Sequence, residues 1–289
     1  MRSKLFVPGS RPELFAKALA SQADAISIDL EDAVAENRKA QARAEVARFL
    51  QSDEVRTTCK VVIVRVNGLK TPHFEADLMA VTRTGLALLN VPKLECAEDV
   101  HDAVLLLARA EVANGVIEPT RLLVNIETPK ALQYAAEIAT AHPRLAGLQL
   151  GYADLFEPLA IDRSDRANVH AVMFAIRMVA AAAGLFAYDG AFANVQDSAG
   201  YRAEAEMARR LGYWGKSCIH PCQIALANDV FRPSDEDIVH ARRVLDASCQ
   251  AEADGLGAFM VDGRMIDKPL IRRAEAIVAM AQHLRLVTP

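Results

Sequence analysis

Eight short apolar runs, separated by longer segments with helical spacing, constrain the fold of this chain most strongly. The runs are residues 5–7, 25–30, 61–66, 86–91, 122–126, 147–151, 185–188 and 215–219. The segments with helical spacing are residues 12–21, 36–50, 73–83, 97–114, 129–140, 168–183 and 201–211. A short run that is apolar throughout is typical of a strand buried on both faces of a parallel sheet. Eight such strands alternating with helices predict an α/β fold, a TIM (β/α)₈ barrel, which fits within 289 residues.

A doubly wound open sheet is the alternative to the barrel. Its dinucleotide-binding form carries G-x-G-x-x-G in the first turn. The first turn here reads Pro8-Gly9-Ser10-Arg11-Pro12, which does not match. Open sheets also usually have fewer than eight strands, so we favour the barrel.

The segment after the eighth run does not continue the repeat. Helical patterns cover residues 221–231 and 233–253, an apolar segment covers 258–261, and a last helix is predicted over 269–286. We therefore predict a catalytic barrel domain over residues 1–231 and a C-terminal helical cap or arm over residues 232–289.

Charge and composition exclude several classes of partner. Thirty-three Lys and Arg against thirty-seven Asp and Glu give a net charge of −4, so no broad basic surface points to nucleic acid or anionic lipid. The most apolar stretch, residues 172–187, is interrupted by Arg177 and is shorter than the ~20 residues of a membrane span. Only three apolar residues precede Pro8, so no signal peptide is expected. Five cysteines, an odd number, favour a reducing compartment. We predict a cytoplasmic protein.

Polar residues follow every predicted strand from the second to the eighth. In chain order they are Asp29, Glu31 and Asp32; Arg65 and Asn67; Lys93 and Glu95; Glu127; Asp154; Asp189; and His220. The carboxyl ends of barrel strands meet at one rim, where barrel enzymes carry their active sites. The sequence therefore predicts a site at this rim.

Glu127 and Asp154 follow the fifth and sixth predicted strands. Neighbouring strands lie about 4.8 Å apart, and Mg²⁺ is commonly held at ~2.1 Å by one or two carboxylates plus waters or substrate. The pair is therefore predicted to bind a hard divalent ion. The structural alternative is that Glu127 caps the helix beginning at Thr128-Pro129 and Asp154 accepts hydrogen bonds from turn amides.

Arg65 ends an apolar strand, so its guanidinium is expected to be nearly buried. Its planar fork suits a substrate carboxylate or an enolate oxygen; the alternative is a buried salt bridge to Glu31 or Glu127. Lys93 either has a similar role or only neutralises the acidic rim.

Asp29, Glu31 and Asp32 form an acidic cluster that needs a neutralising partner. Near a metal ion they would hold its water ligands, and we favour that role for Asp29 and Glu31. For Asp32, an ion pair with Lys39 or Arg43 in a solvated turn is an equal alternative.

Cys218 and Cys222 flank His220, but their spacing differs from a C-x₂-C zinc pair and no second pair is present. We expect His220 to lie at the barrel rim rather than to bind zinc. We expect solvent-exposed positions for Asp197, Glu204 and Glu206, which lie on the helix predicted over residues 201–211 and in the turn before it.

The motifs together resemble the citrate lyase β-subunit-like members of the HpcH/HpaI aldolase superfamily. They are RSKLFVPGSRPELFAKA at 2–18, DAISIDLEDAV at 24–34, RVNG at 65–68, VPKLE at 91–95, NIET at 125–128, GYADL at 151–155, AYDG at 187–190, LGYWGKSCIHPCQI at 211–224 and DGRMIDKP at 262–269. Each is weak alone, but in this order they cover nearly the whole chain.

The resemblance implies a TIM-barrel carbon–carbon lyase that requires Mg²⁺, with Mn²⁺ as a substitute. Such enzymes cleave or form 3-hydroxyacyl-CoA thioesters, such as citryl-CoA or malyl-CoA, with an acyl-CoA and a 2-oxo acid as the two halves. By motif, the metal ligands carry over to Glu127 and Asp154 and the enolate-stabilising arginine to Arg65. Asp267 resembles an acid/base that a neighbouring subunit lends to the site. The resemblance thus implies a homo-oligomer, a trimer or a dimer of trimers, in which the arm packs on a neighbouring subunit.

Substrate identity is not fixed by these motifs. Residues 156–162, which border the acid-binding pocket, depart from many relatives, which have a glycine near position 160. Lys17, Lys39 and Arg43 are candidate contacts for the CoA phosphates, with an ordinary helix-surface role as the alternative. Alternative functions are a citrate lyase complex β-subunit acting on an acyl-carrier-protein thioester, a malyl-CoA thioesterase, and a non-catalytic barrel that binds a 2-oxo acid.

Overall fold

A computed structural model describes residues 1–287 of the chain. The chain divides into two compact units, Met1–Phe231 and a second unit that begins at Arg232. The first unit holds eight strands of one sheet, and the second holds two helices and a two-stranded hairpin. No helix in the described part of the chain is long and apolar enough to cross a membrane.

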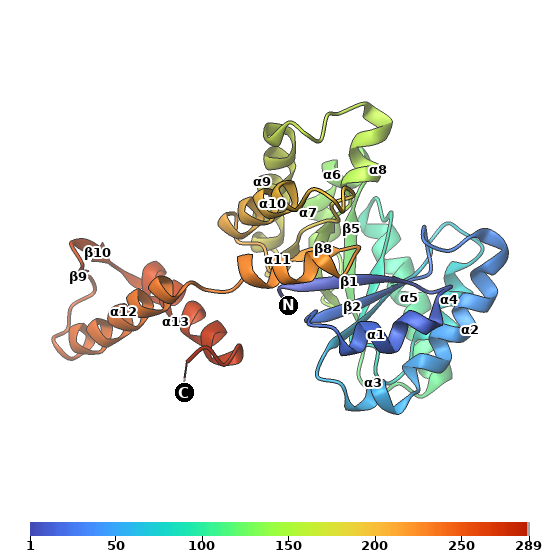
Figure 1. Cartoon of the computed structure of the whole chain (residues 1–289), viewed down its shortest axis with the longest axis horizontal. Helices are drawn as coiled ribbons and strands as arrows, with labels where there is room; N and C mark the ends of the chain where they lie inside the picture. The colour runs from blue at the N-terminus through green and yellow to red at the C-terminus, as the bar shows by residue number, and fades with distance from the viewer. Residues whose placement is uncertain (288–289) are drawn as a thin grey trace. The chain divides into compact units, whose positions relative to one another are not determined.

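The eight strands of the first unit form a parallel barrel (Figure 1). Each strand pairs with its neighbours in the order β7-β6-β5-β4-β3-β2-β1-β8, and a parallel bridge between Asp189 and Lys216 joins the two ends of this row. The predicted (β/α)₈ barrel is therefore confirmed. The strands are β1 (Ser3–Pro8), β2 (Ala25–Asp29), β3 (Val61–Arg65), β4 (Leu88–Val91), β5 (Arg121–Ile126), β6 (Leu145–Leu150), β7 (Phe186–Tyr188) and β8 (Lys216–Cys218).

Helices surround the barrel and follow the predicted segments closely. Two five-residue helices, α3 and α8, are absent from the sequence prediction because periodicity cannot identify so short an element. The helices are α1 (Phe15–Ala20), α2 (Lys39–Leu50), α3 (Asp53–Thr57), α4 (Phe74–Val81), α5 (Ala97–Asn114), α6 (Pro129–Gln133), α7 (Ala135–Thr140), α8 (Tyr152–Phe156), α9 (Arg166–Ala182), α10 (Ser198–Arg210) and α11 (Cys222–Val230), with 3₁₀ turns η1 (Pro12–Leu14), η2 (Glu36–Arg38) and η3 (Glu157–Leu159).

Two separate apolar clusters show which strand positions face the barrel interior. Val62 and Val64 of β3 belong to the large core shared with the helices, whereas Ile63 packs in a small cluster with Ala25 and Leu88. Since successive side chains of a strand point to opposite faces, the small cluster lies inside the barrel. It fills the amino-terminal end of the interior.

The same alternation carries polar side chains to the other end of the interior. Two residues after Ile63 comes Arg65, and two after Leu88 comes Asn90; both lie at matching positions of neighbouring strands. The barrel therefore has an apolar bottom and a polar top, and the polar top is at the carboxyl ends of the strands.

The second unit is a small helical layer with its own core. It consists of α12 (Asp235–Ala253), a hairpin of β9 (Phe259–Val261) and β10 (Arg264–Ile266), and α13 (Lys268–His283). Asp262 and Gly263 connect the hairpin with φ angles of 51° and 77°, as a two-residue type I′ turn requires. The prediction missed β10, although Asp-Gly between apolar residues is a strong hairpin signal. The buried core residues are Ala241, Val244, Val261, Ile266 and Ala274.

A buried ionic cluster closes the seam between β7 and β8. Lys216 Nζ is fully buried and lies 2.6 Å from Asp189 Oδ2 and 2.5 Å from Glu204 Oε1. Tyr152 donates its hydroxyl proton to Asp189 Oδ1 over 2.8 Å. The expectation that Glu204 is solvated was wrong: it is buried on α10, because the ammonium of Lys216 inside the sheet requires opposite charge.

We expect Lys216→Met to lower the free energy of unfolding by about 3–5 kcal/mol, because it leaves buried Asp189 without its cation and leaves Glu204 with Arg163 alone. Urea titration followed by tryptophan fluorescence measures this loss. The single tryptophan, Trp214, stacks on Phe186 of β7 with 4.7 Å between ring centroids, so it reports on the seam.

Arg202→Met is the matched control. Arg202 and Asp229 form a 2.8 Å ion pair between α10 and α11, but both side chains are exposed. Its loss is expected to cost at most about 1 kcal/mol. Equal losses in the two variants would contradict a special role for the seam cluster.

Candidate active site

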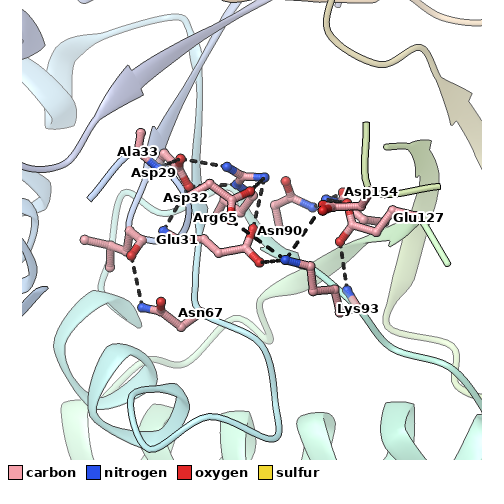
Figure 2. Close-up of polar contacts among 12 residues, drawn as sticks. Asp29, Glu31, Asp32, Ala33, Arg65, Asn67, Asn90, Lys93, Glu127 and Asp154 are labelled. Carbon is pink, nitrogen blue, oxygen red and sulfur yellow. Dashed lines mark hydrogen bonds and ion pairs between the residues drawn. The ribbon is translucent and has the colours of Figure 1, made fainter. Parts of the chain in front are cut away.

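Glu127 is a buried carboxylate that directly follows β5, at the polar end of the barrel. It is 1% exposed. Its Oε1 accepts a hydrogen bond from the backbone N–H of Lys93 (2.9 Å), and its Oε2 accepts one from Asn125 Nδ2 (3.0 Å) (Figure 2). Burial raises the pKa of Glu127 to about 7, and the negative charges of Glu31 and Asp154 add to the effect. Among the described residues this carboxylate is thus held by hydrogen-bond donors and has no ion-pair partner.

Asp154 lies beside Glu127 because a short helix starts immediately after β6. The strand ends at Leu150, and Asp154 sits in the first turn of α8. Its carboxylate is partly exposed, and Oδ2 is 3.7 Å from Lys93 Nζ. Since Lys93 also contacts Glu127 through its backbone, the two carboxylates meet at one residue (Figure 2).

Lys93 holds this arrangement with an unusual backbone. Its φ of 55° lies in the left-handed region, which costs a residue with a side chain about 1–2 kcal/mol. The turn directs its N–H to Glu127 while its ammonium lies 2.9 Å from Glu31 Oε1. Burial opposes the charge of Lys93, but the surrounding carboxylates outweigh it and raise its pKa. Strain of this kind is typical of functional sites.

Arg65 is fixed by a two-point contact with Asp29. Its Nε and one Nη donate to the two carboxylate oxygens of Asp29, each over 2.7 Å. The other Nη lies 3.0 Å from Glu31 and 3.3 Å from Asp32. Burial opposes the charge, but these carboxylates raise the pKa of Arg65 above its usual value.

The buried partner of Arg65 is therefore mainly Asp29, and no ion pair with Glu127 occurs among the described residues. Asp32 pairs with Arg65 and Lys93, which supports its place in the site; the equal alternative, a pairing with Lys39 or Arg43, does not occur among the described residues. Asp32 is more than half exposed and is the most weakly held of the acids around Arg65.

The charges of this site do not balance. Five carboxylates surround only two cationic side chains, and the five are Asp29, Glu31, Asp32, Glu127 and Asp154 (Figure 2). No group of three or more His, Cys, Asp or Glu side chains with metal-binding geometry occurs within residues 1–287. Two carboxylates are nevertheless sufficient for Mg²⁺, which keeps several water or substrate ligands. The donor set fits a hard divalent ion rather than zinc.

His220 lines a pocket of the first unit. It is exposed, and its Nδ1 is 3.0 Å from Cys222 Sγ. Cys218 is buried against Tyr201, so the two cysteines do not face a common centre. Residues of β1, η1, α1 and the segment after β8 enclose a pocket of about 480 Å³, whose lining includes Phe6, Arg11, Lys17 and His220.

The other two candidate phosphate contacts are occupied within the protein. Lys39 Nζ donates to the carbonyls of Leu30 and Glu31, each at 3.0 Å, and to Asn67 Oδ1 at 2.6 Å, which uses all three ammonium protons. Arg43 pairs with buried Asp77 at 2.7 Å. These contacts favour a structural role for both.

Asp267, the remaining candidate, belongs to the second unit. It is the residue at which α13 begins, it is partly exposed, and its side chain does not cap the helix.

Ala160 follows η3 in an unusual backbone conformation. Its φ of 52° lies in the left-handed region that glycine adopts without penalty. The loop over residues 156–162 thus makes a glycine-type turn with an alanine.

Sequence reasoning missed a row of buried polar side chains beneath Glu127. They are Lys4, Asn90, Asn125 and Gln149, all at most 4% exposed. Their signal was present: each interrupts an otherwise apolar strand at a position that alternation directs inward. A prediction based only on the residues at the strand ends does not include these four side chains.

Comparisons with known proteins identify the family of the chain. Residues 2–221 match the family described as HpcH/HpaI aldolase/citrate lyase. The L-malyl-CoA/beta-methylmalyl-CoA lyase of Cereibacter sphaeroides (strain ATCC 17025 / ATH 2.4.3) is 36% identical over 304 residues, covering 98% of this chain and 95% of that protein. The citrate lyase subunit beta of Haemophilus influenzae is 37% identical, covering 97% of each chain.

A solved structure is similar over the same length. Protein CitE from Mycobacterium tuberculosis, in complex with magnesium, acetoacetate and coenzyme A, superposes with a TM-score of 0.77 at 33% identity. The match covers 98% of this chain and 100% of that chain.

We expect Gly151→Ala to destabilise the barrel because a Cβ at this position would overlap Glu127 Oε2. Overpacking of this kind costs about 1–3 kcal/mol, measured as the free energy of unfolding in urea. Gly68→Ala is the control, since the nearest atom to its added Cβ, in Thr71, would lie 3.8 Å away. A Gly151→Ala protein as stable as Gly68→Ala would show that Glu127 is not confined as described.

Proposed function

The chain belongs to the HpcH/HpaI aldolase/citrate lyase family, as its motifs predicted, and from this premise we propose that it is a Mg²⁺-dependent carbon–carbon lyase. Its substrate is a 3-hydroxyacyl-CoA thioester of the malyl-CoA or citryl-CoA type, which it splits into an acyl-CoA and a 2-oxo acid, or forms from them. The observation that carries the proposal is the pair of carboxylates, Glu127 and Asp154, that meet at Lys93.

Glu127 and Asp154 are the residues that would hold the ion. The excess of carboxylates around them and the raised pKa of Glu127 support this role, because a divalent cation removes the cost of burying that charge. When bound, Mg²⁺ acts as a Lewis acid on the oxygens of the 2-oxo-acid half and as a template for its orientation. Glu31, whose charge acts on Glu127, is the acid suited to hold a water of the ion. Both oxygens of Asp29 already accept hydrogen bonds, from Arg65 and from backbone N–H groups, so Asp29 acts through Arg65.

Arg65 supplies positive charge where the reaction develops negative charge. Cleavage removes the proton of the substrate hydroxyl and breaks the bond between the carbinol carbon and the α-carbon. The electron pair moves to the thioester as an enolate, which then takes a proton at the α-carbon. Asp29 holds the guanidinium plane, and displacement of exposed Asp32 by substrate frees an N–H to stabilise the enolate oxygen.

The pocket that contains His220 is suited to the CoA part of the substrate. Arg11 and Lys17 offer positive charge for phosphates, and the apolar lining offers surface for the remainder. Phe6 forms part of this lining, and its ring also lies 5.2 Å from the Arg65 guanidinium. A thioester extending past Phe6 would therefore reach Arg65.

Glu127→Gln and Asp154→Asn test the metal assignment. Each is expected to lower Mg²⁺-dependent turnover about 10³-fold or more, since metal stabilisation of the transition state is worth several kcal/mol and ~1.4 kcal/mol is tenfold in rate. Release of 2-oxo acid is measured with malyl-, methylmalyl-, citramalyl- and citryl-CoA, with Mg²⁺ and with EDTA. Circular dichroism verifies the fold.

Glu118→Gln and Asp102→Asn, both exposed, are the matched controls and should leave turnover unchanged. Full Mg²⁺-dependent turnover in Glu127→Gln or Asp154→Asn would refute the metal site. Release of free CoA without an oxo acid would indicate a thioesterase. Metal binding without turnover of any thioester would indicate a non-catalytic barrel.

The similarity to a citrate lyase subunit beta, as high as that to the malyl-CoA lyase, supports a second candidate function. In that case the acyl group is carried by an acyl carrier protein. The same assay with citryl-acyl carrier protein separates the two: turnover of this substrate alone would replace the CoA thioester in our proposal.

We place the catalytic acid/base, Asp267, in a site completed by two subunits of a homo-oligomer, a trimer or a dimer of trimers. The second unit is small, and its hairpin exposes Met260 and Met265, 63% and 65% accessible, which a partner surface would cover. Five cysteines without a disulfide in the described part of the chain support a cytoplasmic location.

Mixing Asp267→Asn with Arg65→Ala tests this shared site. Each variant alone is expected to be inactive, whereas random mixed oligomers at equal amounts should regain about a quarter of wild-type activity, because symmetric head-to-tail interfaces then pair one intact barrel with one intact arm. Oxo-acid release and native mass spectrometry give activity and composition.

Arg65→Ala mixed with Glu127→Gln is the control, since both changes lie in the barrel and no intact site can form. Mixed oligomers of Asp267→Asn and Arg65→Ala that stay inactive would contradict the shared site.

A further inference from the structure

A chain of hydrogen bonds runs inside the barrel from Lys4 to Glu127. Lys4 Nζ donates to Gln149 Oε1, and Gln149 Nε2 donates to Asn125 Oδ1 over 3.1 Å. Asn125 Nδ2 then donates to Glu127 Oε2 over 3.0 Å. Lys4, Gln149 and Asn125 lie in β1, β6 and β5, Glu127 directly follows β5, and all four are buried.

Asn90 independently fixes the orientation of the Asn125 side-chain amide in this row of hydrogen bonds. Its Nδ2 donates to the backbone carbonyl of Leu123 (2.9 Å), which can only accept, so the orientation of the Asn90 amide is determined. The same Nδ2 donates to Asn125 Oδ1 over 2.8 Å. Asn125 Oδ1 therefore has two donors, and its Nδ2 must face Glu127.

Lys4, at the other end of this row of hydrogen bonds, imposes the same direction. Lys4 is fully buried, and the rings of Phe6 and Tyr188 face its ammonium at 4.5 Å and 5.3 Å. Its hydrogen-bond acceptor is Gln149 Oε1, so the amide nitrogen of Gln149 is turned to Asn125. Every amide in the row has one permitted orientation, and the row ends on Glu127.

We propose that Asn125, oriented by Asn90, Gln149 and Lys4, is a positioning residue that fixes the Glu127 carboxylate for the metal ion. The inference rests on the proposed function, in which Glu127 is a metal ligand. With one oxygen held by Asn125 and the other by the Lys93 N–H, the carboxylate needs no rearrangement when the ion binds. Preorganisation of this kind raises metal affinity.

The test is the Kd of Mg²⁺ and Mn²⁺ for the metal-free full chain, by isothermal titration calorimetry. Asn125→Leu should weaken binding about 10- to 100-fold, the usual effect of losing a hydrogen-bond partner of a metal ligand. Gln149→Met and Lys4→Met should weaken it in the same direction and progressively less, because they act through Asn125.

Lys4→Met separates positioning from simple electrostatics. Burial lowers the pKa of Lys4 well below its usual value, so Lys4→Met removes at most one positive charge near the cation site. That change by itself would strengthen metal binding or leave it unchanged, so weaker binding indicates positioning. Ser27→Ala is the matched control: Ser27 is fully buried on β2 and its hydroxyl has no hydrogen-bond partner among the described residues. Its Kd should equal that of the wild type.

Thermal unfolding accompanies each titration, so that loss of folded protein is not read as loss of affinity. If Asn125→Leu does not fold, Gln149→Met and Lys4→Met decide the question. Wild-type affinity in these two variants would overturn the inference and leave the proposed function standing. A wild-type chain that binds neither ion would overturn both.

Discussion

The site depends on one carboxylate, that of Glu127, which the barrel buries with hydrogen-bond donors but without an ion-pair partner among the described residues. An ionised carboxylate in such a place is costly, as its pKa of about 7 shows. Most proteins avoid that cost by pairing the charge. Here the two cations whose charge acts on Glu127 are engaged elsewhere, Arg65 by Asp29 and Lys93 by Glu31. The charge of Glu127 is therefore kept available for an external ion.

Backbone features in the loops around Glu127 preserve this arrangement. Lys93 adopts a left-handed conformation that is unfavourable for a side-chain-bearing residue, and in doing so directs its N–H to the carboxylate. Gly151 leaves the space that Glu127 occupies, because any Cβ there would overlap it. The backbone strain at Lys93 and the glycine at position 151 each lower stability locally, and the large apolar core around the barrel offsets these costs. The free energy gained by packing the core thus compensates for the cost of burying the Glu127 carboxylate.

The sequence was sufficient for the barrel because eight apolar runs with helical segments between them leave few alternatives. It was sufficient for the location of the site because strand ends converge in any such barrel. It was insufficient where spacing carries no information about contacts. Glu204 was assigned to the solvated face although it lies three residues after Tyr201, on the buried face of α10, where it pairs with Lys216. Asp32 is only seven residues from Lys39 in sequence, yet it pairs with Arg65 and Lys93.

Diffraction from crystals of the full chain grown with MnCl₂, recorded at the manganese absorption edge, tests the central claim most directly. The account predicts one anomalous peak in the barrel with carboxylate oxygens of Glu127 and Asp154 both within about 2.2 Å of it. A fully occupied manganese site elsewhere, with no peak between these two residues, would contradict it.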